Sequence, residues 1–458
     1  MRKISRQGLA FWSEFFRMTI PIILTQLLTS TLHIVDNIMV GRLGDTALAS
    51  VAQANQLIFL LRLALFGIAS GCSIFASQHW GVKDIPGIRR AVGTSMIATL
   101  IVSVAATVAA IFFPEQVMRI YTKDPEVILL GAQYLRIVGI GYIPVGLSLT
   151  YNAANRSTER VKINLVASAA AILCNVFFNW CFIFGNLGFP RLEVRGAAIA
   201  TTIASMLEAV VLIGWTYYKK YPAAGTISQM KPQSLAQVKR FYKVAFPVIA
   251  NECIWATGTS AYYAVYGRMS TQIVAAMNVF STVEQVLMAF TFGIMNAASV
   301  IVGKRIGAGL EDEAVSCGKR MMWVTAGLSL PMGALLLLSR SSILSLFNLS
   351  EAANSAAYAV MGVAAFTFTL RSVNTVSVVG IVRSGGDAIF SMIVDGGSIW
   401  AIGVPLAILG GLVFKWHIAY VYLLIQSEEL VKGIVCLLRF KSRKWMHNLV
   451  ETEKTGAT

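Results

Sequence analysis

A single carboxylate, Asp36, stands inside an apolar stretch of helical length that runs from Pro21 to Gly41. Gln26, Thr29, His33 and Asp36 follow at spacings of three, four and three residues, which places them on one helical face. At membrane depth an ionised side chain costs roughly 2.5–3.5 kcal/mol on insertion scales, so such an acid is a functional candidate. The stripe is interpreted as an ion or proton site or as a hydrogen-bonding seam between helices. Gln26 and His33 are candidates for lining a substrate cavity.

A second polar stripe lies in the other half of the chain. It consists of Glu252, Trp255, Thr259, Tyr262 and Tyr266, at spacings of three, four, three and four residues. Aromatic faces attract cations by roughly 0.5–2 kcal/mol each, which suits a lipophilic organic cation. The stripe therefore predicts a substrate-binding face, with packing or interfacial aromatics as the alternative. Asp395 could face a cavity on the cytoplasmic side, and a structural role is equally open.

The composition indicates that these stripes lie in a membrane protein. Hydrophobic residues make up 56% of the 458 residues, charged residues make up 13%, and the mean hydropathy is +0.67. A soluble chain needs more charge to cover its surface. We predict an all-α polytopic fold. Its twelve spans are 15–40, 47–79, 91–113, 127–152, 164–185, 196–218, 241–266, 272–302, 320–339, 354–382, 389–413 and 417–438.

The net charge of +16 follows the predicted topology and does not indicate a nucleic-acid partner. With the N-terminus in the cytoplasm, most Lys and Arg residues fall on the cytoplasmic side, including those of the 219–243 segment and the C-terminal tail. Both termini are therefore expected in the cytoplasm. The six Cys and four His residues show no metal-ligand spacing, and no nucleotide-binding or nucleophile motif occurs. We expect no cofactor and no enzymatic activity.

An internal repeat divides the chain into two halves. A shift of 226 residues places Pro21 on Pro247, Gly41-Arg42 on Gly267-Arg268 and Phe66-Gly67-Ile68 on Phe292-Gly293-Ile294. Six predicted spans per half make the repeats parallel, related by a pseudo-two-fold axis along the membrane normal. The expected parts are an N-terminal six-helix lobe (1–220), a cytoplasmic linker (221–240), a C-terminal six-helix lobe (241–440) and a cytoplasmic tail (441–458).

The ordered motifs resemble those of the multidrug and toxic compound extrusion (MATE) transporters, in a superfamily that also contains lipid-linked-precursor and polysaccharide flippases. The residues that carry the resemblance are Pro21, Gln26, Asp36-x-x-Met39-x-Gly41-Arg42-Leu43-Gly44, Phe66-Gly67-Ile68, Asn175-x-x-x-Asn179, Val194-x-Gly196-Ala197-Ala198, Pro247, Gly267-Arg268 and Arg383-x-Gly385-Gly386-Asp387. The likeness spans nearly the whole chain, apart from the two tails.

The resemblance implies that Asp36 binds the coupling ion and that Asn175, Asn179 and Thr201 complete its site. Independently, Asn175 and Asn179 are four residues apart and share a helical face. Carboxylate, amide and hydroxyl oxygens suit a hard cation such as Na⁺, whereas a proton needs only the carboxylate. Several relatives carry Asp where Asn179 stands, so the choice between Na⁺ and H⁺ stays open. The two Asn residues could alternatively bridge helices.

The function implied is a secondary active antiporter in a bacterial cytoplasmic membrane. It would export hydrophobic or cationic organic compounds in exchange for Na⁺ or H⁺, and we expect a monomer. The alternative within the superfamily is a flippase of lipid-linked precursors or polysaccharides, which would need a cationic cavity for phosphate. An integral-membrane transferase would need acid, base or metal groups clustered at one membrane surface, and the sequence offers none.

Overall fold

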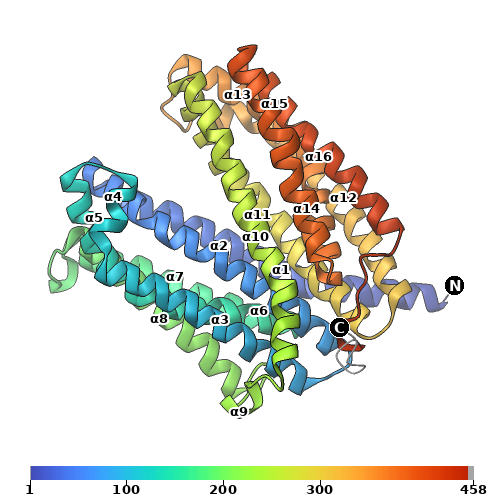
Figure 1. Ribbon diagram of the computed structural model, residues 1–458. Coiled ribbons are helices and arrows are strands. Elements are labelled where there is room, and N and C mark those ends of the chain that lie inside the picture. The colour runs from blue at the N-terminus through green and yellow to red at the C-terminus, as the bar shows by residue number, and fades with distance from the viewer. Residues whose placement is uncertain (1, 452–458) are drawn as a thin grey trace. The chain divides into compact units, whose positions relative to one another are not determined.

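The computed structural model describes residues 2–451, except for the side chains of residues 2–10 and of His33. The predicted cavity role of the His33 side chain therefore lies outside the described part. Figure 1 shows the helices of the first half. They are α1 (Arg2–Gly41), α2 (Asp45–Gly81), α3 (Ile85–Phe112), α4 (Pro114–Tyr121), α5 (Pro125–Val138), η1 (Gly139–Gly141), α6 (Tyr142–Ser157), α7 (Val161–Phe184), η2 (Asn186–Gly188), α8 (Glu193–Tyr218) and α9 (Ile227–Met230).

The second half repeats the pattern of long helices. It contains α10 (Leu235–Met269), α11 (Thr271–Gly307), α12 (Glu311–Leu344), α13 (Glu351–Thr375), η3 (Val376–Val382), η4 (Arg383–Gly385), α14 (Ala388–Ser398), η5 (Ile399–Gly403), α15 (Val404–Ile408), η6 (Leu409–Val413) and α16 (Ile418–Lys441). All twelve predicted spans coincide with helical segments, which confirms the all-α polytopic fold. In the described residues, ten segments are long and apolar enough to cross a membrane. The seventh and twelfth spans, α10 and α16, complete the twelve and carry several charges each.

The chain divides into two compact units. The N-terminal unit comprises Leu24–Ala245, and the C-terminal unit comprises the residues up to Ile23 together with those from Phe246 onward. The two units differ from the predicted lobes, because α1 and α10 each contribute residues to both units. Each of these helices contains a proline, Pro21 in α1 and Pro247 in α10. Proline removes one backbone hydrogen bond inside a helix, so both are local weak points.

Helix ends follow ordinary capping chemistry. The side chain of Asp84 accepts a hydrogen bond from the backbone N–H of Gly87 and so caps α3. Ser270 and Ser350 cap α11 and α13 in the same way. At the end of α7, Gly185 adopts a φ of 76°, the left-handed conformation that closes many helices. These caps satisfy backbone groups that have no partner within the helix.

In the N-terminal unit, α7 and α8 pack side by side, as Figure 1 shows. Gly196 makes this close approach possible, because a Cβ there would lie 2.5 Å from the carbonyl oxygen of Phe182. Small and aliphatic side chains of α2, α3, α6, α7 and α8 form the core, which includes Cys72, Ile88, Val92, Tyr151, Ala154, Ala167 and Leu212. The short α9 joins this core through Met230.

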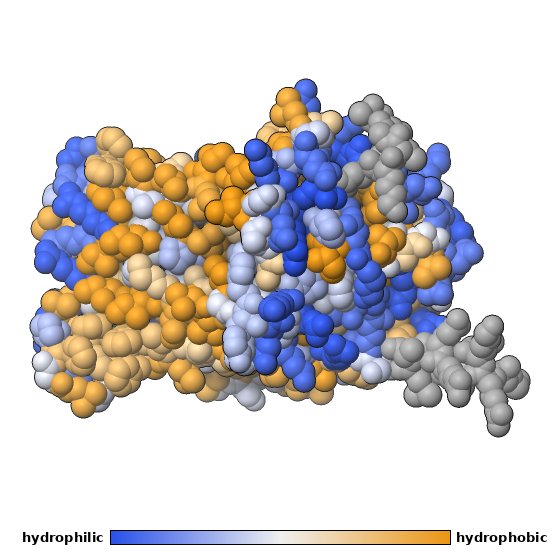
Figure 2. Space-filling model, turned by 90° about the horizontal axis from the view of Figure 1, so that it is seen from below, coloured by the Kyte–Doolittle hydropathy of each residue, from blue (hydrophilic) through white to orange (hydrophobic). Residues whose placement is uncertain are grey.

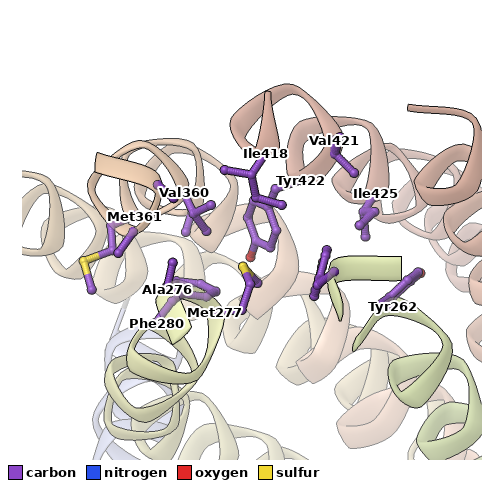
Figure 3. Close-up of a cluster of buried hydrophobic side chains, with 14 of the residues drawn as sticks. Tyr262, Ala276, Met277, Phe280, Val360, Met361, Ile418, Val421, Tyr422 and Ile425 are labelled. Carbon is purple, nitrogen blue, oxygen red and sulfur yellow. The ribbon is translucent and has the colours of Figure 1, made fainter. Parts of the chain in front are cut away.

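The C-terminal unit has its own apolar core, shown in Figure 3. Phe280 of α11 meets Tyr422 of α16 edge to face, with 5.4 Å between the ring centroids. The remaining labelled side chains come from α10, α11, α13 and α16.

Large apolar side chains of both units are exposed, among them Leu173, Trp323, Leu338 and Phe366. Figure 2 shows such apolar surface, in orange, over much of the face in view, as expected where lipid replaces water.

Spans ten and eleven are irregular. The segments η3, η5 and η6 are π-helical, with one extra residue in a turn. Such turns occur frequently near functional sites. One of them, η5, directly follows α14, the helix that carries Asp395. No composition signal in the sequence predicted these turns.

The chain after α16 is packed against the C-terminal unit. We call residues 442–451 the C-terminal strap. Trp445 is fully buried and stacks on Phe440, with 5.4 Å between ring centroids. The backbone N–H of His447 donates to the carbonyl of Gly385 at 2.8 Å, next to an isolated β-bridge between Gly386 and Met446. The strap therefore covers the turn between α13 and α14.

Candidate functional site

Asp36 lies in the last third of α1 and forms hydrogen bonds with the residues predicted to accompany it. The Nδ2 group of Asn179 donates to Asp36 Oδ1 at 2.6 Å and to Asn175 Oδ1 at 2.8 Å. Asn175 Nδ2 in turn donates to Thr201 Oγ1 at 3.4 Å. We call these four residues the Asp36 network. It joins α1, α7 and α8 within the N-terminal unit.

The Asp36 network has an unsatisfied acceptor next to its carboxylate. Asn175 and Asn179 are buried, and Asn179 Oδ1 has no hydrogen-bond partner in the described part of the chain. A buried polar atom without a partner is costly and calls for an explanation. The two ends of an amide are nearly indistinguishable in shape, so Asn179 can present its oxygen toward Asp36 when a cation lies between them. Carboxylate, amide and hydroxyl oxygens make the donor set fit a hard cation.

Two further residues of this site were missed by the sequence analysis. The Tyr134 hydroxyl, from α5, donates to Asn55 Oδ1 of α2 at 3.4 Å. Tyr134 interacts electrostatically with Asp36. Spacing rules connect residues within one helix, whereas Tyr134 reaches the site from a different span. A polar residue in an otherwise apolar span was the available signal.

Gln26 is partly exposed on α1 and forms no hydrogen bond with the Asp36 network in the described structure. Ten residues separate Gln26 from Asp36, which corresponds to about 15 Å along a helix. The shared face predicted for the two residues therefore extends over almost three helical turns. A cavity role for Gln26 stays a prediction.

In the C-terminal unit the predicted acidic residues are paired with cations. Glu252 Oε1 lies 3.1 Å from Nη1 of Arg383, whose side chain is buried. Asp395 accepts a hydrogen bond from Asn251 at 3.1 Å and lies 3.0 Å from Lys432 Nζ. The acids of α10 and α14 thus serve as partners of buried bases. Neither carboxylate stands alone as a counter-ion for a substrate.

Lys432 connects Asp395 to the acids of its own helix. Its Nζ lies 3.3 Å from Glu429 Oε1 and 3.9 Å from Glu428 Oε1. Glu428 and Lys432 are four residues apart on α16, and their contact is the longest of the three. Tyr262 donates to Glu428 Oε2 at 2.7 Å. A further ion pair joins Glu284 to Arg371.

The predicted acidic and aromatic face of α10 is divided in the structure. Tyr262 and Tyr266 belong to the apolar core of the C-terminal unit, whereas Trp255 is exposed. Glu252 forms an ion pair with Arg383. These residues do not form one accessible surface, and their role in substrate binding stays a prediction.

Eight paired charges inside the C-terminal unit do not balance. Five carboxylates (Glu252, Glu284, Asp395, Glu428 and Glu429) face three cationic groups (Arg371, Arg383 and Lys432). Uncompensated charge is costly away from water, so such groups take up protons or cations instead. Electroneutrality of these eight residues therefore requires two more positive charges. In the described part of the chain no group of three His, Cys, Asp or Glu is arranged to hold a metal ion.

Comparison with known proteins matches the chain to one family of transporters. The MatE family model matches residues 21–181 and 247–409. The uncharacterized transporter YisQ of Bacillus subtilis is 22% identical, over 94% of this chain and 95% of YisQ. The multidrug resistance protein PmpM of Pseudomonas aeruginosa is 22% identical, over 87% of this chain and 84% of PmpM.

Solved structures show the same fold. An outward-facing multidrug resistance MATE family transporter of the MOP superfamily matches with a TM-score of 0.86 at 17% identity, covering 94% of this chain and 96% of that one. A second match is a MOP superfamily transporter from Pyrococcus furiosus, for which a reverse polarity of the binding pocket suggests a different function. It has a TM-score of 0.86 at 17% identity and covers 96% of both chains.

Proposed function

Because this multi-pass membrane protein belongs to the MatE family, we propose that it is a secondary active antiporter that exports hydrophobic or cationic organic compounds. The coupling ion is Na⁺ or H⁺, and its site is the Asp36 network. The observation that carries the proposal is the buried Asn179 amide oxygen, unpartnered among the described residues, beside the Asp36 carboxylate. The multidrug resistance relatives, such as PmpM, support the class of substrate.

Ion binding would work by changing contacts between helices. A cation or proton at Asp36 replaces or weakens its hydrogen bond with Asn179, and this bond joins α1 to α7. A ligand shifts a conformational equilibrium only through different affinities for the two states. The contacts of α1 with α7 would thus differ between the ion-bound and the ion-free protein. If the ion site and the substrate site are negatively coupled, linkage requires that ion and substrate weaken each other's binding by the same factor. No covalent chemistry is needed, so the protein acts as a transporter rather than as an enzyme.

The alternative is a flippase of lipid-linked precursors or polysaccharides. The fold does not decide between the two functions, because the Pyrococcus furiosus transporter, for which a reverse polarity of the binding pocket suggests a different function, shares it. A flippase would need cationic groups facing the phosphate of a lipid-linked precursor. In the C-terminal unit, Arg383 and Lys432 are bound to acids, which argues against that role. We place the protein in the bacterial cytoplasmic membrane with both termini in the cytoplasm, as the distribution of Lys and Arg indicates.

The test is efflux of ethidium from proteoliposomes under a Na⁺ gradient and, separately, under a pH gradient. The wild type should respond to one of the two gradients, and Asp36→Asn should abolish the response while the protein stays folded. Asp45→Asn, an exposed change of the same kind in the same unit, is the matched control and should retain efflux. Flipping of a fluorescent lipid analogue, with no gradient-driven efflux, would overturn the antiporter proposal.

A second variant separates the two ions. Asn179→Ala removes an oxygen ligand but leaves the Asp36 carboxylate in place. If Na⁺ is the coupling ion, the Na⁺ concentration for half-maximal efflux should rise about tenfold or more, which corresponds to one lost ligand to a charged group. If H⁺ is the coupling ion, the dependence on Na⁺ should be absent in both proteins.

A further inference from the structure

The C-terminal strap lies against two glycines of the turn between α13 and α14. The turn is Arg383-Ser384-Gly385-Gly386, and a Cβ at Gly385 would lie 2.4 Å from the carbonyl oxygen of Trp445. Gly386 has a φ of 93°, in the left-handed region that favours glycine. The backbone N–H of His447 donates to the Gly385 carbonyl at 2.8 Å. The glycines therefore allow the strap to lie directly on the backbone of the turn.

The strap has a buried anchor and an exposed ion pair. Trp445 is fully buried and stacks on Phe440 of α16. Arg443 lies 2.8 Å from Asp312 of α12, but the two side chains are 51% and 86% exposed. Exposed ion pairs contribute little to stability. Local detachment of the strap therefore costs mainly the contacts of Trp445, and it need not unfold the helices.

Arg383, the first residue of the turn, connects the turn to α10. Its side chain is only 2% exposed, and Nη1 donates to Glu252 Oε1 at 3.1 Å. Its Nε and Nη2 atoms are buried and have no hydrogen-bond partner among the described residues. Removing one member of a buried ion pair is strongly destabilising, because the other is left uncompensated. A shift of the turn would therefore disturb a contact that Arg383 cannot replace with water.

Glu252 receives this contact at a weak point of α10. The helix passes from the N-terminal unit to the C-terminal unit between Ala245 and Phe246, and Pro247 removes a backbone hydrogen bond there. Glu252 follows Pro247 by about one and a half helical turns. Its neighbour Asn251 donates to Asp395 of α14 at 3.1 Å. The stretch of α10 just after Pro247 is thus held by side chains from the turn and from the helix that follows it.

The first half of the chain offers an internal comparison. The sequence repeat places Gln26 at the position of Glu252 and Arg156 at the position of Arg383. Gln26 is neutral, and the two glycines are replaced by Thr158-Glu159. The Nε atom of Arg156 is buried without a hydrogen-bond partner in the described residues. The acid, the glycine pair and the strap therefore occur together in the second half, as expected if they act as one device.

We propose that the C-terminal strap is a latch for α10. With the strap in place, the covered turn holds Arg383 on Glu252, and this contact fixes α10 just beyond Pro247. When the strap detaches, the turn and Arg383 shift, and α10 becomes free to bend at Pro247. The latch goes beyond the proposed export, because it does not depend on which compound or ion the protein moves.

The test is hydrogen–deuterium exchange, read by mass spectrometry, of the full-length protein in nanodiscs. Trp445→Ala should speed amide exchange about tenfold both in the turn, residues 383–386, and in residues 248–256 of α10. Exchange follows the free energy of local opening, and tenfold is the effect expected for a weakened hydrogen bond between charged groups. Trp323→Ala is the matched control in the same unit. That side chain is 78% exposed, so its removal should leave both segments unchanged.

A second variant loosens the strap without removing a buried side chain. Gly385→Ala places a Cβ against the Trp445 carbonyl and should speed exchange in the same two segments. Gly397→Ala meets open space and should not. Should Trp445→Ala fail to fold, this pair of variants decides the matter.

A double variant tests whether the effect passes through the ion pair. Glu252→Gln alone should speed exchange in residues 248–256. Adding Trp445→Ala to it should speed exchange there by less than about twofold more, because both changes weaken the same contact. Independent effects that multiply in the double variant would overturn the latch. Faster exchange in the turn alone, with residues 248–256 as slow as in the wild type, would also overturn it. The readout needs no transport, so either result stands whether or not the proposed antiport is correct.

Discussion

Lys432 is the cation that joins three acids of the C-terminal unit, and its replacement by methionine should strongly destabilise that unit. The Nζ atom lies 3.0 Å from Asp395, 3.3 Å from Glu429 and 3.9 Å from Glu428. The Lys432 side chain is only 6% exposed, so water cannot take over the role of the lost ammonium group. Methionine keeps most of the length of the side chain, and the change therefore removes charge rather than volume.

The expected magnitude follows from the burial of the partners. Removing one member of a buried ion pair costs about 3–5 kcal/mol, because the other member is left uncompensated. For a unit of roughly 200 residues, each 1 kcal/mol lowers the unfolding midpoint by about 2–4 °C, which gives a shift of about 6–20 °C. The network already holds more acids than bases, so the variant makes an existing imbalance worse.

The assay is thermal unfolding of the purified protein, followed by intrinsic tryptophan fluorescence. Lys441→Met, at an exposed position near the end of the same helix, is the control and should shift the midpoint by less than about 2 °C. Combining Lys432→Met with Asp395→Asn should recover part of the loss, because one stranded carboxylate is removed. A midpoint for Lys432→Met equal to that of the wild type would refute the reasoning. In that case the three acids would already be neutralised by protons or bound cations.

Three further predictions concern single contacts. Gly403→Ala should lower the free energy of unfolding by about 1–3 kcal/mol in chemical denaturation, because the added Cβ would collide with the Tyr262 hydroxyl and with Glu428. Gly397→Ala is the control and should leave the stability unchanged, because a Cβ at residue 397 meets open space. Trp445→Ala should release the C-terminal strap and speed tryptic cleavage after Arg443, and an unchanged cleavage rate would show that the strap does not depend on Trp445. The hydrogen bond from His79, together with that from the Gly87 N–H, lowers the pKa of Asp84 to about 2. The ionised Asp84 carboxylate therefore stabilises the folded protein fully above about pH 4, and this contribution is lost as the pH falls through about 2. Asp84→Ala should therefore be about 1 kcal/mol less stable than the wild type at pH 7, with a smaller difference near pH 2.

The spans and the polar residues of the N-terminal unit could be predicted, because the sequence signals for both lie within single helices. Apolar length marks a span, and the i, i+4 spacing of Asn175 and Asn179 marks a shared face. The family resemblance supplied the connection between these residues and Asp36, and the structure brings all three together with Thr201. Their binding of an ion stays a prediction.

The pairing of charges in the C-terminal unit could not be predicted in this way. Glu252 and Arg383 are 131 residues apart, so their contact depends on how α10 packs against the end of η3 and η4. Lys432 lies closer to Asp395, on another helix, than to Glu428 on its own. In the same way, Tyr134 reaches the Asp36 network from α5. Within-helix periodicity identifies a polar face but not the partner that it meets.

The position of the C-terminal strap in the chain has a consequence for biosynthesis. Chains are made from the N-terminus at about 5–20 residues per second, and domains fold as units in that order. The strap is made after every helix from α1 to α16, yet it covers the turn between α13 and α14 and buries Trp445 against Phe440. A nascent chain that stalls before residue 442 would hold all of these helices but leave that turn uncovered. The turn is thus completed only by residues made after α16, and a fusion partner is best attached beyond residue 451.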